Sequence, residues 1–421
     1  FHVAVSGRPG PVVLGLPEDM LSEPAEVPDR PRVEPVRQCF DAAAAEAVGT
    51  LLADAERPLV IVGGPRWNEQ AARDLAAFAG AWDLPVAVPF RRQDRLDNRH
   101  PSYIGDLNFA PNPALARRVA EADVVLALGT RLGDIVTGGY TRIDPLTEPA
   151  TSGRRLIHIH ADPDEPGKVF HADLAFAAPA DVAVAALARL APPAGGRRWA
   201  RWRAEARADY ERWLEPVRLP GELQLGEVIR WLSENLPEDA IVTNGAGNYA
   251  GFLHRHFQFR RFGQQLAPTS GSMGYGLPAA IAAALTRPGR QIVCLAGDGC
   301  MQMTMNEMST ARQYGARLVA LVVNNGIYGT IRMHQERRFP GRVIGSDLAN
   351  PDWPALARAQ GWHGARVTRT ADFPAAFAEA AACDGPALIE LVLDPEALTP
   401  GRTLAQIRAE ALAARGEGRS G

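Results

Sequence analysis

Cysteine is scarce in this sequence, because 421 residues include only four cysteines and none of them forms a C-x-x-C pair. They are Cys39, Cys294, Cys300 and Cys383. They are too few and too scattered for a disulfide scaffold, and they indicate neither a zinc ribbon nor a thioredoxin-type site. Such cysteine usage suits a reducing compartment, and we therefore expect a cytoplasmic protein.

The sequence also lacks an excess of charge of one sign and long apolar runs. Lys and Arg number 45 against 48 Asp and Glu, and both signs are scattered along the chain. This balance argues against a nucleic-acid-binding protein and against a polybasic protein of the membrane surface. The longest apolar runs, such as 318–323, are far shorter than the roughly 20 residues that span a bilayer. We expect no nucleic-acid partner and no membrane association.

The start of the chain shows no recognisable leader sequence. It begins Phe1-His2-Val3, without an initiator Met and without a charged segment followed by an apolar one. No secretory signal is visible in this start, and we expect the chain to be a fragment.

Length and pattern predict more than one domain. At roughly 150 residues per domain, 421 residues indicate two or three domains. Hydrophobic residues at 46% and charged residues at 22% are typical of a globular protein. Buried-strand patterns alternate with helical ones, and this alternation is typical of parallel sheets covered on both faces. We therefore predict the α/β class with two doubly wound parallel-sheet domains.

The first of these domains is predicted over 36–192. Its apolar runs predict strands at 58–64, 85–88, 123–128 and 156–160, and helices at 69–80 and 181–190. Residues 191–203 (APPAGGRRWARWR) interrupt the alternation and predict the start of an inter-domain connection.

The second domain is predicted over 220–400, and a tail over 401–421 ends in the frayed segment EGRSG. Its predicted strands are 240–244, 291–296, 317–324 and 386–392, and its predicted helices are 223–235, 277–285, 302–314, 353–360 and 371–382. Ahead of both domains, residues 10–17 (GPVVLGLP) predict one strand whose partners we expect to lie upstream.

The strongest chemical signal is Gly297-Asp298-Gly299 followed by Asn324-Asn325. Each motif ends an apolar run, and open α/β sheets bind ligands at the carboxyl ends of their strands. The glycines allow a tight turn and a close approach to a ligand, and the N-terminus of the following helix favours a phosphate. A carboxylate and an amide oxygen, joined by a backbone carbonyl, form the oxygen-only set that Mg²⁺ prefers. The alternative is a helix-capping Asp and a turn Asn pair, which are common separately and much rarer in this combination.

These residues resemble a known signature. GDGCMQMTMNEMSTARQYGARLVALVVNN is similar to the GDG…NN motif of thiamin-diphosphate-dependent enzymes. Residues 270–280 (SGSMGYGLPAA) resemble the segment that holds the cofactor's aminopyrimidine, and 243–249 (TNGAGNY) the earlier diphosphate loop. Residues 7–20 (GRPGPVVLGLPEDM) resemble the last strand of the N-terminal pyrimidine domain. The C-terminal pattern ALIELVLDPEALTPGRTLAQIR is nearest to the acetohydroxyacid (acetolactate) synthase-like branch.

The resemblance covers essentially the whole chain and implies an identity for each part. Residues 1–30 would be the C-terminal remnant of the pyrimidine-binding domain. Residues 36–192 would be the middle domain, and 220–400 the pyrophosphate-binding domain. Mg²⁺ would be bound by the side chains of Asp298 and Asn325 and by the carbonyl of Ile327.

The resemblance also implies contacts to thiamin diphosphate. The N–H groups of Gly299 and Cys300 would donate to the diphosphate, and Asn248 would contact it from the other loop. The carbonyl of Gly271 would accept from the 4′-amino group. Met273 would wedge between the two rings and bend the cofactor, so that its own imino nitrogen reaches the C2 proton. The alternative for Met273 is ordinary core packing.

The catalytic residue is not assigned to this chain. In the family, a glutamate that protonates the pyrimidine N1′ comes from the N-terminal pyrimidine domain of a neighbouring subunit, of which we expect only the last strand here. Glu307 and Glu18 do not occupy its place, and we interpret them as a helix first-turn or solvated residue and a loop charge. We therefore expect this chain alone to bind cofactor poorly and to be inactive.

The residues after the Asn pair bear on the substrate. Simple decarboxylases that resemble pyruvate decarboxylase carry a Glu near the position of Ile331, so this subclass is disfavoured. Acetohydroxyacid synthases carry a Trp that would align with His334, and this departure puts acetolactate synthesis itself in question. Arg332 and His334 either face the active site, where they would recognise a polar acceptor, or are exposed helix residues.

Residues 128–134 (LGTRLGD) resemble in part the loop that meets FAD in the synthase branch, or else simply end a strand. FAD binding stays open. His158 and His160 alternate along a predicted strand and share one face, but with no third ligand in view we expect no metal there. His254 and His256 receive no role.

We therefore predict a thiamin-diphosphate- and Mg²⁺-dependent enzyme of acetolactate synthase type that acts on a 2-keto acid, and we expect a homodimer or homotetramer. The alternatives are a 2-keto-acid or acyl-CoA decarboxylase of the same fold and a non-catalytic cofactor-binding subunit. A nicotinamide-dependent dehydrogenase is disfavoured, because the strand at 58–64 leads into GGPRW rather than GxGxxG and no acidic residue follows at the expected interval.

Overall fold

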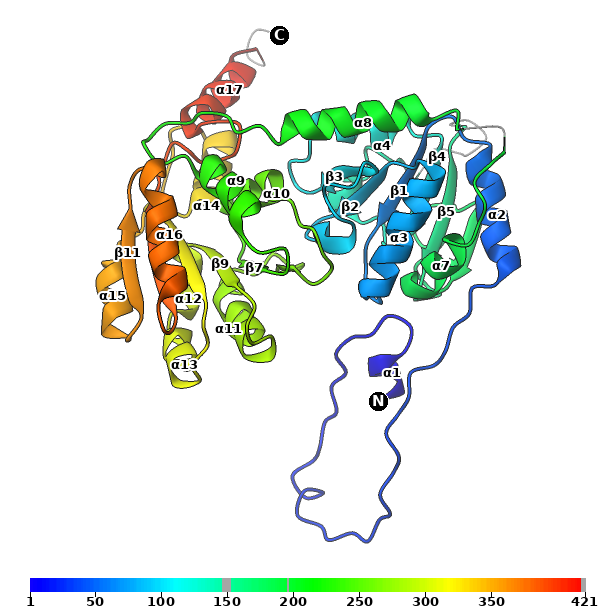
Figure 1. Ribbon diagram of the computed structural model, residues 1–421, viewed down its shortest axis with the longest axis horizontal. Coiled ribbons are helices and arrows are strands. Elements are labelled where there is room, and N and C mark those ends of the chain that lie inside the picture. The colour runs from blue at the N-terminus through cyan, green and yellow to red at the C-terminus, as the bar shows by residue number, and fades with distance from the viewer. Residues whose placement is uncertain (146–152, 195–196, 418–421) are drawn as a thin grey trace. The chain divides into compact units, whose positions relative to one another are not determined.

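A computed structural model describes residues 1–145, 153–194 and 197–417. The chain divides into two compact units (Figure 1). The first unit comprises residues 1–96 and 100–209, and the second comprises 97–99 and the residues from 210 onward. Each unit is built on a six-stranded parallel sheet, so the predicted α/β class with two parallel-sheet domains is confirmed.

The sheet of the first unit has the strand order β3-β2-β1-β4-β5-β6. Its strands are β1 Pro58–Val62, β2 Val86–Pro89, β3 Tyr103–Leu107, β4 Val124–Leu128, β5 Arg155–His160 and β6 Leu174–Ala177. The helices of this unit include α2 Ala42–Ala53, α3 Glu69–Trp82, α4 Pro113–Glu121, α5 Asp134–Thr137 and α7 Ala180–Leu187. All residues of β1 and β4 are buried, as the continuous apolar runs of doubly covered parallel strands require.

The sheet of the second unit has the order β11-β12-β10-β9-β7-β8. Its strands are β7 Ile241–Asn244, β8 Gln265–Leu266, β9 Ile292–Gly297, β10 Val319–Asn324, β11 His363–Val367 and β12 Ala387–Val392. Its helices include α9 Leu225–Asn235, α10 Tyr249–His256, α11 Gly276–Thr286, α12 Asp298–Thr304, α13 Glu307–Gln313, α14 Gly329–Arg338, α15 Trp353–Ala359, α16 Phe373–Ala382 and α17 Leu404–Glu417. Helix α8 Ala200–Trp213 stands between the two sheets in the sequence.

Both faces of the second sheet carry a hydrophobic core. Alternate residues of β9 enter different clusters: Val293 and Leu295 pack with residues of α9, α10 and α16, whereas Cys294 packs with residues of α11, α13 and α15. This follows from the two-residue period of a strand. Figure 1 shows these helices flanking the sheet. The central strands are therefore held on both sides, and their carboxyl ends are fixed in place.

Two sequence predictions about segments outside the sheets are wrong. Residues 10–17 form no strand and are exposed, because no strand among the described residues pairs with them. The predicted helix 302–314 is two helices, α12 and α13, because the chain passes directly from β9 into a helix at Asp298. The predicted connection 191–203 overlaps the start of α8.

The predicted tail 401–421 contains a helix. Before α17, the Thr403 N–H donates to Gln406 Oε1 (2.9 Å) and the Gln406 N–H donates to Thr403 Oγ1 (3.1 Å). This reciprocal pair is a capping box, which stabilises the first turn of a helix. The segment EGRSG was expected to be frayed. Its residues from 418 onward lie outside the described part of the chain.

A bilayer-spanning helix is not found among the described residues, since none combines sufficient length with sufficient apolar character.

A buried histidine makes the second unit sensitive to acid. Burial lowers the pKa of His256 from 6.5 to about 4, and its Nδ1 lies 2.8 Å from the carbonyl of Leu214. The unfolded chain therefore binds more protons between these two pH values, so stability is complete above pH 6.5 and falls as the pH decreases toward 4. We expect a loss of about 2–3 kcal/mol between pH 7 and pH 4.

Urea unfolding of the second unit at several pH values measures this loss. His256→Gln should flatten the pH dependence, whereas His334→Gln, which replaces an exposed histidine, should leave it unchanged. An identical pH dependence in wild type and His256→Gln would contradict the assignment.

Candidate cofactor and metal site

A pocket of about 240 Å³ lies at the carboxyl ends of β7, β9 and β10. All residues that the sequence singled out as cofactor or metal ligands line it, and they are Asn248, Gly271, Met273, Asp298, Gly299, Cys300, Asn325 and Ile327. They come from loops far apart in the sequence but from one unit. The parallel sheet brings these strand ends to one edge, where open α/β sheets bind ligands.

Asp298 is the buried acid of the pocket, with 3% of its surface exposed. Its Oδ1 accepts from the N–H of Gly299, and its Oδ2 accepts from the N–H of Gly326 and from Asn350 Nδ2, each at 2.9 Å. Burial raises the pKa of Asp298, and the hydrogen bonds act in the opposite direction. An ionised carboxylate offers about four acceptor positions, and the backbone of Asn325 is a further donor to it, so a cation would share the carboxylate oxygens with these donors.

The two asparagines after β10 have different partners. Asn324 Nδ2 donates to Glu390 Oε1 at 2.7 Å, so this side chain is engaged within the sheet. Asn325 Oδ1 accepts from the N–H of Ile327 at 3.2 Å, and Asn325 lines the pocket. The turn 325–327 therefore presents Asn325 and Ile327 on the same pocket as Asp298.

Asn350 is a residue of this network that sequence reasoning missed. Its Nδ2 donates to both Asp298 Oδ2 (2.9 Å) and Asn324 Oδ1 (2.8 Å), and its Oδ1 accepts from Gln302 Nε2 (2.6 Å). The dipeptide Asn350-Pro351 marks a turn, but no sequence pattern says that this turn reaches the ends of β9 and β10. Asn350 is thus a positioning residue for the Asp298 carboxylate.

Replacing Asn350 by Ala is expected to cost about 1–3 kcal/mol, because it removes one of the two donors to Asp298 Oδ2 and one of the two to Asn324 Oδ1, and in each case only the Gly326 N–H remains. Denaturant unfolding of the second unit measures this cost. The control is Asn235→Ala, which removes an exposed amide that donates to the carbonyl of Trp231 and should change stability by less than about 0.5 kcal/mol. Equal effects of the two substitutions would show that Asn350 does not hold the carboxylate.

The loop after β7 is tied to α14 and to α12. Asn248 Oδ1 accepts from Thr330 Oγ1 (3.0 Å), and its Nδ2 donates to Met333 Sδ (3.4 Å). The hydroxyl of Tyr249 donates to Cys300 Sγ at 3.2 Å, and the thiol of Cys300 donates to the carbonyl of Ala246 at 3.0 Å. Burial raises the pKa of Tyr249 well above 10, so the phenol stays neutral.

Two glycines allow the strand end to pack closely around the pocket. A Cβ on Gly297 would lie 2.7 Å from the Tyr249 ring, and one on Gly299 would lie 2.6 Å from the Tyr328 ring. Such separations are shorter than van der Waals contact. The backbone here is a cradle that side chains would fill, and the donor set around it contains oxygen atoms of the kind that Mg²⁺ binds.

Gly271 and Met273 lie on the rim of the pocket. Gly271 has φ +77°, a conformation that glycine adopts without strain. Met273 is 37% exposed, so it is not a core residue, and its interpretation as ordinary core packing is wrong. A half-exposed apolar side chain on a pocket rim is available to a ligand.

Arg332 and His334, on the helix after the Asn pair, do not face the pocket. Arg332 is engaged with the loop at 346–347, since its Nε donates to Ser346 Oγ (2.6 Å) and its Nη2 pairs with Asp347 (2.5 Å). His334 is exposed, and neither residue is among those that line the pocket. Ile331 does line it.

Glu307 and Glu18 behave as expected. Glu307 lies in the first turn of α13 and accepts from Thr310 Oγ1 at 2.8 Å, and Glu18 is an exposed loop residue.

His158 Nε2 lies 2.9 Å from the carbonyl of Thr130. Among the described residues, no group of three His, Cys, Asp or Glu side chains is placed to hold a metal.

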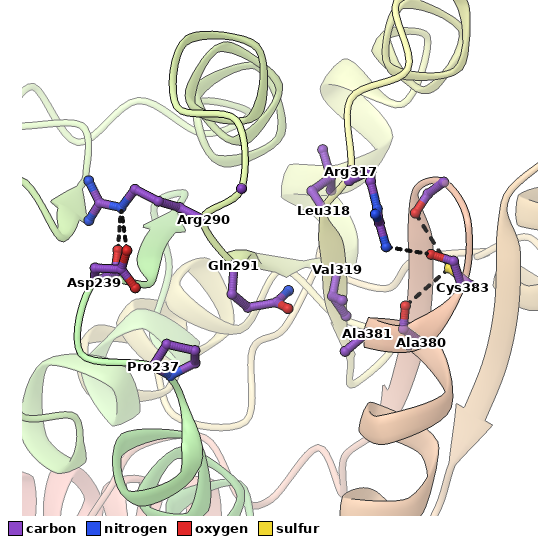
Figure 2. Close-up of a pocket in the computed structure, with 12 residues that line it drawn as sticks. Pro237, Asp239, Arg290, Gln291, Arg317, Leu318, Val319, Ala380, Ala381 and Cys383 are labelled. Atoms are coloured by element: carbon purple, nitrogen blue, oxygen red, sulfur yellow. Dashed lines mark hydrogen bonds and ion pairs between the residues drawn. The ribbon is translucent and has the colours of Figure 1, made fainter.

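A second cavity, of about 380 Å³, opens at the opposite edge of the same sheet, where β9, β10 and β12 begin (Figure 2). Its arginines point to acceptors of the protein: Arg317 Nη2 donates to the carbonyl of Cys383 (3.3 Å), and Arg290 pairs with Asp239 (3.8 Å). Helices of a parallel sheet end at this edge, and their carbonyl ends favour cations. Arg317 therefore satisfies the end of α16, and Arg290 is paired with the turn before β7. The smaller pocket remains the candidate site.

Comparison with known families identifies both units. Residues 45–187 match the central domain of thiamine pyrophosphate enzymes, and residues 245–391 match their C-terminal TPP binding domain. The chain belongs to the thiamine pyrophosphate enzymes. The candidate pocket lies in the part that matches the TPP binding domain.

Acetolactate synthases are similar to this thiamine pyrophosphate enzyme along most of the chain. It is 29% identical to the acetolactate synthase isozyme 2 large subunit of Escherichia coli over 94% of the chain and 70% of that protein. It is 32% identical to the acetolactate synthase large subunit of Parasynechococcus marenigrum over 87% of the chain and 60% of that protein. It is 27% identical to the acetolactate synthase large subunit of Corynebacterium glutamicum over 94% of the chain and 65% of that protein. The chain thus spans between 60% and 70% of the length of these relatives.

In the central domain, the loop after β4 contains the residues that resemble an FAD-contacting segment. Gly129 has φ +74°, and a Cβ there would lie 2.4 Å from the carbonyl oxygen of Gly63, so the loops after β1 and β4 touch. The strand order changes direction between these two strands, which is where sheets of this order bind dinucleotides. The loops after β1 and β4 are therefore where a dinucleotide such as FAD would bind in this sheet.

Proposed function

We propose that this chain is the cofactor-binding part of a thiamin-diphosphate- and Mg²⁺-dependent enzyme of acetolactate synthase type. It would catalyse decarboxylation of a 2-keto acid and carboligation of the product. The observation that carries this proposal is the meeting of Asp298, Asn325 and Ile327 at one pocket, opposite the Asn248 loop.

The groups around the pocket suit a hydrated cation that holds a diphosphate. We assign Mg²⁺ to the Asp298 carboxylate, the Asn325 amide oxygen and the Ile327 carbonyl, because these are hard oxygen donors. Buried carboxylates are stabilised in their ionised form by a nearby cation. We assign the diphosphate to the N–H groups of Gly299 and Cys300 and to Asn248. The Gly299 N–H also donates to Asp298 Oδ1, so its contribution is shared.

The remaining pocket residues would orient the reacting half of the cofactor. When bound, thiamin diphosphate supplies a carbanion that attacks the keto carbonyl and an electron sink for the loss of CO₂. The carbonyl of Gly271 would accept a hydrogen bond from the amino group of the pyrimidine, and Met273 would hold the two rings at an angle. Ile331 and Leu398 line the same pocket, and their apolar side chains would keep water from the reacting carbon.

Two residues of α14 bear on the acceptor substrate. Ile331 argues against a simple decarboxylase with a glutamate at this position, and exposed His334 is not a tryptophan that selects a second keto acid. The alternatives are a 2-keto-acid or acyl-CoA decarboxylase and a non-catalytic cofactor-binding subunit. We further propose a cytoplasmic homodimer or homotetramer, and we leave FAD out of the reaction.

A screen of 2-keto acids with thiamin diphosphate and Mg²⁺ supplied tests the function. It should be applied to this chain and to the complete product of its gene. We expect CO₂ release and an acetohydroxy acid from the complete product and neither from the chain alone. CO₂ without a condensation product would favour the decarboxylase, and cofactor binding without turnover would favour the non-catalytic subunit. Decarboxylation of pyruvate by the chain alone, at the rate of the complete product, would overturn the expected inactivity.

A further inference from the structure

We infer that the C-terminal helix α17 holds the turn 325–328 in place through α14, and that Glu336 and Arg408 are positioning residues for this turn. The functional part of this inference rests on the proposed Mg²⁺ and diphosphate site. The role of α17 itself is argued from packing and charge alone.

The first link is a small apolar cluster that is separate from the two sheet cores. It consists of Ile327, Met333, Leu398, Leu404 and Ile407, all at most 7% exposed. Two of these residues belong to α17, one to α14 and one to the proposed cation-binding turn. Removing α17 would expose the apolar surface of the turn itself, at a cost that grows with the area exposed.

The second link is an ion pair between a buried carboxylate and a guanidinium whose side chain is 40% exposed. Glu336 of α14 is completely buried, and its Oε1 accepts from Arg408 Nη2 of α17 at 2.5 Å. Its Oε2 accepts from the N–H of Gly341 at 2.8 Å. A buried carboxylate that loses its charged partner is strongly destabilising. The present position of α14 therefore depends on the docking of α17.

The third link joins α14 to the pocket. The first residues of α14 line it, and Thr330 hydrogen-bonds Asn248 of the opposite loop. A Cβ on Gly329 would lie 2.5 Å from Leu398 and 3.3 Å from the Asn325 amide nitrogen. There is little free space between the cluster and the turn, so a shift of α14 would move Asn325 and Ile327.

Hydrogen exchange of the full chain tests this coupling without any ligand. We expect Arg408→Ala to raise the exchange rate of the amides of residues 325–333 at least tenfold, while β9 and β10 stay protected. The matched control is Arg402→Ala, which removes an exposed pair with Glu410 on the same segment and should leave these amides unchanged. Unchanged exchange in Arg408→Ala, or an equal increase in both variants, would overturn the inference.

A double variant separates a specific contact from general loss of structure. Glu336→Gln keeps the shape of the side chain without its charge, so Arg408→Ala should raise exchange less in this background than in wild type. Arg408→Lys should restore part of the protection. Additive effects of Glu336→Gln and Arg408→Ala would contradict a direct coupling of these residues.

Calorimetric titration of the complete gene product with thiamin diphosphate in the presence of Mg²⁺ gives the functional readout. We expect at least tenfold weaker binding to Arg408→Ala than to Arg402→Ala. Equal affinities would overturn the positioning role. If the complete gene product without substitutions shows no Mg²⁺-dependent binding, the proposed function fails, and the exchange data still decide whether α17 holds the turn.

Discussion

Asp298→Ala is expected to reduce Mg²⁺-dependent binding of thiamin diphosphate by more than about 100-fold, because loss of a direct ligand should exceed the 10–100-fold typical of outer-shell changes. The side chain is the only carboxylate among the residues that line the pocket. Without it, the amide and carbonyl oxygens that remain carry no full charge to hold the cation. Titration calorimetry with and without Mg²⁺ measures the change.

Two further variants make this result interpretable. Asp298→Asn keeps the shape of the side chain and removes its charge, so it should also lose the Mg²⁺ dependence. Its amide faces the N–H donors of the pocket, and denaturant unfolding of this variant therefore measures the loss of stability separately from the loss of binding. Asp239→Ala removes a half-exposed acid at the opposite edge of the same sheet and should bind as wild type does. Undiminished cofactor binding in Asp298→Asn and Asp298→Ala would refute the metal assignment.

Gly64→Ala is expected to destabilise the central domain by more than about 4 kcal/mol, a loss seen only for severe disruptions. Gly64 has φ +75°, and a Cβ there would lie 1.7 Å from the carbonyl oxygen of Gly129. That neighbour is backbone at the end of β4, so the clash can be relieved only by moving a strand end. Denaturant unfolding that reports on the first unit measures the loss.

Gly167→Ala isolates the backbone part of this effect. Gly167 has φ +84°, but nothing lies within 4 Å of the position of its Cβ. An alanine there should therefore cost only the roughly 1–2 kcal/mol of a left-handed conformation. Similar losses for the two substitutions would mean that the loops after β1 and β4 separate easily.

The sequence predicted the interior strands of both sheets and missed the outer ones. Long apolar runs marked β1, β4, β9 and β10, which are covered on both faces. The missed strands are β3, β6, β8 and β11, and each lies at the edge of its sheet. Edge strands have one neighbour: β6 alternates between half-buried and exposed residues, β8 has two residues, and β3 contains Gly105 and Asp106. Their sequences lack the pattern on which the prediction depends.

For the site, the sequence was informative where chemistry follows a strand end. Asp298 and Asn325 could be predicted to meet because the ends of neighbouring parallel strands share one edge. Asn350 and Arg408 could not, because neither follows the end of a parallel strand, so no rule of sheet geometry places either of them beside its partner. The Thr403 and Gln406 spacing did carry a helix-start signal, and it was overlooked because the segment was interpreted as a tail.

All groups assigned to the cation and the diphosphate come from loops of a single unit, on neighbouring strands. The residues that would bind the cation and the diphosphate therefore belong to one folded unit. They can stay the same in evolution while the residues near the reacting carbon change. Substitutions at positions such as Ile331, on the first turn of α14, would change the choice of substrate without changing how the cofactor is bound. New substrate preferences can then arise by a few changes around an unchanged anchor.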